Sequence, residues 1–90
     1  MPVRVEFDQA KRDVTLAERG LDFADAINVF EGRSITFEDE RRVYGESRFI
    51  TIGELGERMV VIVWTPRGHA RRIISMRRAN DREQALYTLG

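Results

Sequence analysis

The stretch Glu46–Arg78, ESRFITIGELGERMVVIVWTPRGHARRIISMRR, decides the fold of this chain. It holds three short apolar runs, separated by two connections that contain glycine and charged residues. The middle run, Met59–Trp64, is continuously apolar and rich in β-branched residues, which is typical of a strand covered on both faces. Because both connections are short, neighbouring strands should run antiparallel. We therefore predict a three-stranded meander formed by residues 47–53, 58–65 and 71–77.

Glycine and proline mark the two connections as turns. Gly53 and Gly56 lie in the first connection, and Pro66 with Gly68 lies in the second. The two glycines of the first connection are too weak a signal for a phosphate-binding loop, so we interpret their spacing as a turn. We place Trp64, at the end of the central run, in the core rather than in a nucleobase-stacking role.

The residues that precede this stretch predict a strand and two helices. Val3–Phe7 alternates apolar and charged side chains, as in a short strand. Asp8 is a suitable N-cap and Gly20 a suitable C-terminal stop for a first helix. Asp22 can cap a second helix, Phe23–Phe30, whose apolar residues share one face. The helices are joined by three residues, so we expect a helical hairpin that packs on one face of an antiparallel sheet.

The region between the second helix and the meander carries weaker signals. Ser34–Phe37 is a candidate for a short strand, Glu38–Arg42 for a solvated loop, and Tyr44–Gly45 for a turn. After the meander, Asn80 and Glu83 have the spacing of a capping box, which predicts a C-terminal helix. The expected fold class is α+β in one domain spanning residues 1–90.

Composition narrows the possible functions. The chain has 90 residues, no cysteine and one histidine, so a cysteine-ligated or histidine-cluster metal site is excluded. We expect no metal and no other cofactor. The N-terminal sequence lacks the apolar core of a signal peptide, and the longest apolar run is far shorter than a membrane span. These features predict a cytoplasmic protein that does not contact a membrane.

The charges are distributed unevenly along the chain. Residues 1–40 carry five bases and ten acids (5 − 10 = −5), whereas residues 41–90 carry ten bases and five acids (10 − 5 = +5). All bases except Lys11 are arginine, whose planar fork suits phosphate. The cluster of arginines between residues 67 and 82 indicates a surface that binds an anionic partner.

Three segments resemble the BrnT toxin family. They are FDQAKRDVTLAERGLDFADAINVF (7–30), YGESRFITIGELGERMVVIVWTPRG (44–68) and RRIISMRRANDREQALY (71–87), and they occur in the family's order. The last segment, with its R-I-I-S-x-R-x-A pattern, is the most specific. The first helix departs from the family, which commonly has asparagine and a Lys-His pair there; this chain has Thr15, Glu18 and Arg19.

The resemblance implies a fold, an activity and a set of partners. The fold would be RelE-like, and the chain would be an endoribonuclease toxin that inhibits translation by cleaving RNA without metal, either in solution or on the ribosome. A BrnA-type antitoxin with a ribbon-helix-helix DNA-binding domain would neutralise it, in a complex of two toxins and two antitoxins. Operator DNA would be contacted only through the antitoxin.

Cleavage of RNA without metal requires a base for the 2′-hydroxyl, charge stabilisation at phosphorus and a proton for the leaving oxygen. Arginine suits the second role but is a poor base. In a regular strand Arg71, Ile73, Ser75 and Arg77 would share one face, with Arg72 and Arg78 on the other. The candidate catalytic residues are Arg77, Arg67, Arg48, Glu83 and Tyr87, with Arg77 as the first choice for the phosphate. The candidate RNA-binding residues are Arg71, Arg72, Arg78, Lys11 and His69.

Each candidate also has a structural interpretation. Exposed arginines commonly form surface ion pairs that contribute about 0–1 kcal/mol. Glu83 belongs to the expected capping box, Tyr87 suits the edge of a core, and a single histidine in a turn is usually solvated. Two other functions therefore compete with the ribonuclease: a module that binds nucleic acid or an acidic protein without cleaving it, and a structural subunit whose arginines form an oligomer interface.

Overall fold

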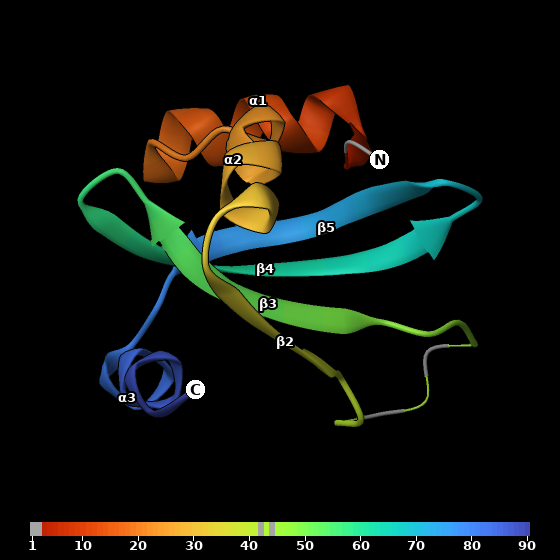
Figure 1. Cartoon of the computed structure of the whole chain (residues 1–90). Coiled ribbons are helices and arrows are strands. Elements are labelled where there is room, and N and C mark those ends of the chain that lie inside the picture. The colour runs from red at the N-terminus through yellow and green to blue at the C-terminus, as the bar shows by residue number, and fades with distance from the viewer. Residues whose placement is uncertain (1–2, 42, 44) are drawn as a thin grey trace.

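The computed structural model describes residues 3–41, 43 and 45–90. Over these residues the chain folds into a five-stranded sheet with helices on both faces (Figure 1). None of the helices in the described part of the chain is long and apolar enough to cross a membrane. The elements follow one another as β1 (Arg4–Phe7), α1 (Gln9–Arg19), the 3₁₀ helix η1 (Phe23–Asp25), α2 (Ala26–Glu31), β2 (Ser34–Glu38), β3 (Phe49–Leu55), β4 (Arg58–Arg67), β5 (Ala70–Arg78) and α3 (Asp81–Leu89).

The three strands of the predicted meander form the middle of the sheet. β3, β4 and β5 pair antiparallel in succession, and β4 occupies the centre of the strand order β1-β5-β4-β3-β2. The continuous apolar run that predicted a central strand is therefore correctly placed. The weaker signal at residues 34–37 is also confirmed as a strand, since β2 pairs antiparallel with β3.

The first strand departs from the expected antiparallel sheet. β1 pairs parallel with β5, and Arg4 is opposite Ala70 while Phe7 is opposite Ile73. The chain therefore starts at one edge of the sheet and reaches the opposite edge at β2, with its helices in between. A short alternating strand indicates which of its side chains are buried, but it does not indicate which strand it pairs with or in which direction.

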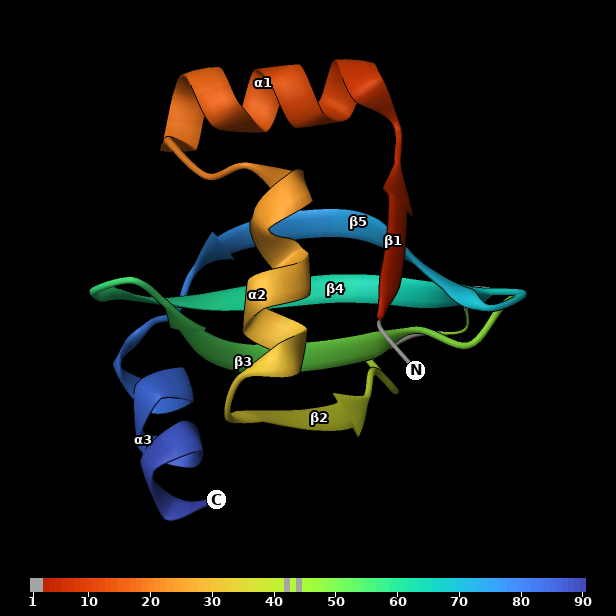
Figure 2. The same ribbon diagram turned by 45° about the horizontal axis from the view of Figure 1, so that its top comes forward.

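The main core lies between α2 and the sheet. Ala26 and Val29 of α2 pack with Leu21, Phe23 and apolar side chains of β4 and β5. Figure 2 shows α2 crossing over the middle of the sheet. A Cβ added at Gly53 would lie 2.7 Å from Cγ1 of Val29, so glycine allows α2 to approach β3 closely. Gly53 was predicted to lie in a turn; instead it is a paired residue of β3, and Gly56, with φ 63°, lies in the turn.

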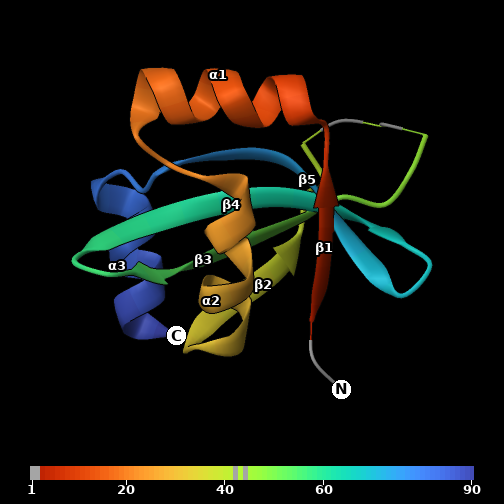
Figure 3. The same cartoon turned by 90° about the horizontal axis from the view of Figure 1, so that it is seen from above.

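The first helix contributes no buried side chain, although all residues of α1 are described. Its caps are as predicted: Asp8 accepts a hydrogen bond from the backbone N–H of Lys11, and Gly20 has φ 68°. Seen from above, α1 continues directly from β1 and runs outside β5 (Figure 3). Polar contacts hold it there, because Arg12 pairs with Asp22 and Arg19 donates to the backbone oxygen of Met76. The expected packing of a helical hairpin on the sheet therefore describes α2 better than α1.

A smaller core lies on the other face of the sheet, under α3. Ile52 and Val61 pack there with Ala79 and Tyr87. Asn80 and Glu83 form both hydrogen bonds of the predicted capping box. α3 covers one end of this face, and no other helix of the described chain lies on it (Figure 1). We call the two faces of the sheet the α2 face and the α3 face.

Candidate functional site

A β-bulge in β5 determines which arginines share a face. Ile73 pairs with Trp64 of β4. Two residues further on, Ser75 pairs with Val63, so Ile74 is an extra residue in the strand. The bulge interrupts the alternation of side chains, and Ile73 and Met76 consequently both lie in the core on the α2 face.

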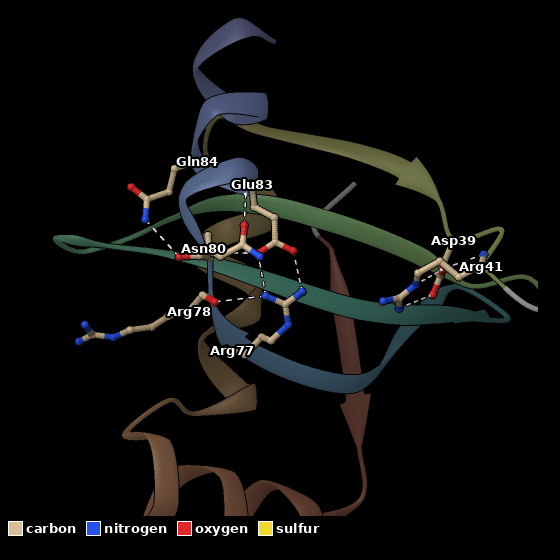
Figure 4. Close-up of polar contacts among 8 residues, drawn as sticks. Asp39, Arg41, Arg77, Arg78, Asn80, Glu83 and Gln84 are labelled. Atoms are coloured by element: carbon tan, nitrogen blue, oxygen red, sulfur yellow. Dashed lines mark hydrogen bonds and ion pairs between the residues drawn. The ribbon is translucent and has the colours of Figure 1, made fainter.

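The predicted faces of β5 are therefore wrong. Arg71 lies against an aromatic ring of α2, whereas Arg77 bonds to Glu83 of α3, so these two arginines are on opposite faces rather than on one. Strand alternation on either side of the bulge places Arg72 with Arg77 on the α3 face and Arg78 on the α2 face. Figure 4 shows the Arg78 side chain pointing away from that of Arg77.

Arg77 and Glu83 form the most closely bonded ion pair on the α3 face. Nη1 and Nη2 of Arg77 donate to Oε1 and Oε2 of Glu83 at 2.7 and 2.6 Å. Oε1 also accepts from the backbone N–H of Asn80 at 2.9 Å. The hydrogen bonds with Arg77 lower the pKa of Glu83, and the same contact raises the pKa of Arg77. Glu83 is thus ionised at neutral pH, and its two oxygens fix the direction of the arginine fork.

Sequence reasoning missed two residues on this face. Asp39, which was placed in a solvated loop, is 4% exposed, and its carboxylate accepts hydrogen bonds at 2.8 Å from Nε and Nη2 of Arg41. Arg41 is close enough for its charge to contribute to the lowered pKa of Glu83 and to oppose part of the rise in the pKa of Arg77. The run of charges at 38–42 has no apolar periodicity that would have predicted a buried carboxylate. Arg42 and Tyr44, also predicted for this connection, lie outside the described residues.

Arg48 and Arg67 lie near one another but not beside Arg77. Both contact Glu46, with Nε of Arg48 at 3.2 Å and Nη2 of Arg67 at 3.9 Å from its oxygens. This group lies at the β4–β5 hairpin, where His69 is exposed in the turn. From the rise per residue of a β-strand, this group lies roughly 20 Å from Arg77 along β5. The candidate catalytic residues therefore do not form one constellation.

Tyr87 is part of the small core rather than an accessible catalytic group. It is 3% exposed, and its hydroxyl donates to the backbone oxygen of Arg33 at 3.2 Å, with Glu54 Oε2 at 3.4 Å. The guanidinium of Arg33 lies over its ring, 4.4 Å from the centroid. These contacts support the expectation that Tyr87 is a core residue.

The remaining candidate RNA-binding residues are dispersed. Arg72 lies on the α3 face, 3.7 Å from Glu6 of β1. Lys11 is exposed on α1, far along the chain from the arginine cluster. Arg71 is half-buried against Phe30 and Trp64 on the α2 face.

The α3 face thus presents guanidinium groups that are held in place by carboxylates. Arg77, Arg41 and Arg72 each have such a partner, and the neighbouring arginines at the hairpin share Glu46. Oriented guanidinium groups can donate to phosphate oxygens and stabilise charge that develops on them. Within the described residues there is no group of three or more histidine, cysteine, aspartate or glutamate side chains arranged to hold a metal ion.

A comparison with family models identifies the group of proteins that the chain resembles. Residues 7–83 match the model described as ribonuclease toxin, BrnT, of type II toxin-antitoxin system. The match includes α1, α2, the strands β2 to β5, Arg77 and Glu83. A search of curated proteins found no match.

Proposed function

Because the chain belongs to the BrnT family of ribonuclease toxins of type II toxin-antitoxin systems, we propose that it is an endoribonuclease that cuts RNA on the α3 face without a metal ion. The observation that carries this proposal is the Arg77–Glu83 pair, which aims a guanidinium across an open sheet face. Cleavage of messenger RNA, in solution or on the ribosome, would stop translation.

In the proposed reaction the 2′-oxygen attacks phosphorus and the 5′-oxygen leaves, giving a 2′,3′-cyclic phosphate. A base takes the 2′-hydroxyl proton, and the leaving oxygen takes up a proton. Arg77 supplies charge stabilisation. The Nη1 and Nη2 atoms of Arg77 are bound to Glu83, and the Nε edge of Arg77 has no partner among the described residues. That edge can donate to phosphoryl oxygens while Glu83 keeps the guanidinium in place.

The proposal also includes the partner. Type II systems pair the toxin with a protein antitoxin, and we infer a BrnA-type antitoxin with a ribbon-helix-helix domain that alone contacts operator DNA. The family match supports this inference, as does the basic C-terminal half of the chain. We further infer a RelE-like fold, supported by the antiparallel β3–β4–β5 meander with α2 packed on one face. The expected location is the cytoplasm.

The test is induced expression without the neighbouring antitoxin gene, with growth measured and RNA 5′ ends mapped. Purified chain, treated with EDTA, should still cut RNA and leave cyclic phosphate ends. Arg77→Ala should lower the cleavage rate by about 10²–10³-fold, the usual effect of removing an oxyanion donor. Arg77→Lys should restore little, because an ammonium cannot reproduce the planar fork.

Arg78→Ala is the matched control. It removes the same charge from the next residue. The sequence made Arg78 a candidate for RNA binding, but its side chain lies on the α2 face, so the variant should cleave near the parent rate at saturating RNA. Each variant must be soluble and bind antitoxin. Binding of RNA without new 5′ ends would support the non-catalytic module instead. Cleavage that persists in Arg77→Ala would reject Arg77 as the phosphate-binding residue.

A further inference from the structure

Arg71 occupies an unusual position on the α2 face. Its guanidinium lies 4.6 Å from the ring centroid of Phe30 and 4.4 Å from that of Trp64. The Trp64 ring is itself fixed, because it stacks on Phe49 and its indole N–H donates to Thr51 at 2.8 Å. Two aromatic contacts of this kind orient a guanidinium without using its hydrogen-bond donors.

No described residue gives Arg71 a hydrogen bond or an ion pair, although the side chain is half-buried. Other partly buried arginines differ: Arg12 pairs with Asp22, and Arg77 with Glu83. Burial lowers the pKa of Arg71, which is the sign of a charge removed from water without an anion beside it. The ring contacts offset part of that cost, and an anion that reached the donors would offset more.

Arg71 lies close to other arginines at the β4–β5 hairpin and on the α3 face. Arg71 lies next to the β4–β5 hairpin, opposite Pro66 of β4 and Val5 of β1. Arg72 follows it on the α3 face, and Arg67 lies at the hairpin itself. A polyanion that crosses the α3 face can therefore continue around the hairpin and meet Arg71 on the reverse side.

We propose that Arg71 anchors a backbone phosphate of single-stranded RNA that passes around the β4–β5 hairpin, outside the cleavage site. The inference rests on the proposed ribonuclease function. The ring faces of Phe30 and Trp64 that contact the guanidinium are not available for stacking on bases. The site thus binds charge rather than sequence, and it increases the affinity for long RNA without taking part in cleavage.

The experiment compares uncleavable 2′-O-methyl RNA of two lengths, about 5 and about 15 nucleotides, at several salt concentrations. Arg71→Met keeps an apolar side chain over the rings and removes the charge. It should weaken binding of the long RNA about tenfold and reduce the magnitude of the salt slope by about 0.7, the effect of one phosphate contact on a single strand. Binding of the short RNA, and cleavage of a short substrate, should equal the parent.

Two further variants serve as controls. Arg58→Met removes one charge at the end of β4 farthest from the β4–β5 hairpin and should leave both affinities unchanged. Arg71→Lys keeps the charge without the planar fork, so it should retain the salt slope but recover only part of the affinity. Trp64 is the single tryptophan, and its fluorescence reports both the integrity of the ring cluster and, in the parent, the arrival of long RNA.

The inference would be overturned if Arg71→Met and the parent had equal long-RNA affinity and salt slope. It would also be overturned if Arg58→Met lost as much affinity as Arg71→Met. Unchanged RNA binding with weakened antitoxin binding would also overturn it, since Arg71 would then receive a protein carboxylate. These results leave the ribonuclease proposal intact. If the parent neither binds nor cuts RNA of any length, both proposals fail.

Discussion

The side chain of Glu83 both caps the N-terminus of α3 and orients the guanidinium of Arg77. Its carboxylate closes the capping box of α3 through the Asn80 N–H and holds both Nη atoms of Arg77. A carboxylate bound by three donors, with its pKa lowered by Arg77, is a weak base for a 2′-hydroxyl. We therefore assign it a positioning role, whereas the sequence alone allowed both base and cap.

Glu83→Gln distinguishes these roles, because glutamine retains a capping oxygen but not the charge. We expect the cleavage rate to fall at least about tenfold through loss of Arg77 orientation, with little change in KM. The acidic limb of the pH–rate profile should stay where it is in the parent. If that limb disappears in Glu83→Gln, Glu83 is the base.

The Arg77–Glu83 pair should also make the free energy of unfolding depend on pH. Because the folded-state pKa of Glu83 is lowered, the pair stabilises the fold above the ordinary glutamate pKa of about 4.3. That contribution is lost as the pH falls through the folded value. Urea unfolding of parent and Glu83→Gln should therefore differ near neutrality and converge in acid.

At the scale of elements, α1 is held by the polar contacts of Arg12 and Arg19 rather than by burial. Asp22 accepts from Arg12 at 2.9 and 2.7 Å and from the backbone N–H of Ala24 at 2.9 Å, so it both caps η1 and ties α1 to it. Arg12 is the main cause of the lowered pKa of Asp22. The Asp22 carboxylate thus positions α1 together with the contact between Arg19 and the backbone oxygen of Met76.

Asp22→Ala should lower the free energy of unfolding by about 1–2 kcal/mol, the usual cost of losing a cap. Amide hydrogen exchange should accelerate most in α1. The loss should shrink in acid, because a carboxylate with a lowered pKa stabilises the fold above about 3.9 and less as the pH falls further. Val14→Asn is the control: Val14 is 54% exposed, so its change should stay within about 0.5 kcal/mol. Equal losses in both variants would mean that packing holds α1.

The elements and the antiparallel meander could be predicted from local signals, but the pairing of β1 and the faces of β5 could not. The apolar run 59–64, the caps Asp8 and Asn80 and the turn glycines each specify a structure within a few residues of themselves. The bulge at Ile74 cannot be recognised in the apolar pattern of the sequence, yet it places Arg71 and Arg77 on opposite faces of the sheet. The burial of Asp39 likewise depends on Arg41 folding onto it and on the neighbouring strand, which composition does not report.

At the scale of the whole molecule, charge is distributed unevenly between the two sides of the sheet. The helical segment 9–31 carries five acids and three bases (3 − 5 = −2) and lies on one side, whereas Arg72 and Arg77 lie on the other (Figure 1). A face that gathers RNA must be covered when the toxin is silent, and covering it replaces contacts with phosphate by contacts with protein. We therefore expect the antitoxin to lie across the α3 face, with two toxins on one antitoxin dimer.

Light scattering of the purified complex should give the mass of two toxins and two antitoxins. Hydrogen exchange should show new protection over β5 and the loop that follows β2, where Arg77 and Arg41 lie, and little change in α1. The complex should not bind the 15-nucleotide RNA that the free toxin binds, and salt should weaken the assembly because its contacts are largely ionic. A particle with one toxin, or protection confined to α1 and α2, would contradict this arrangement. In that case the antitoxin would silence the toxin from the acidic side, and Arg77 would remain exposed in the complex.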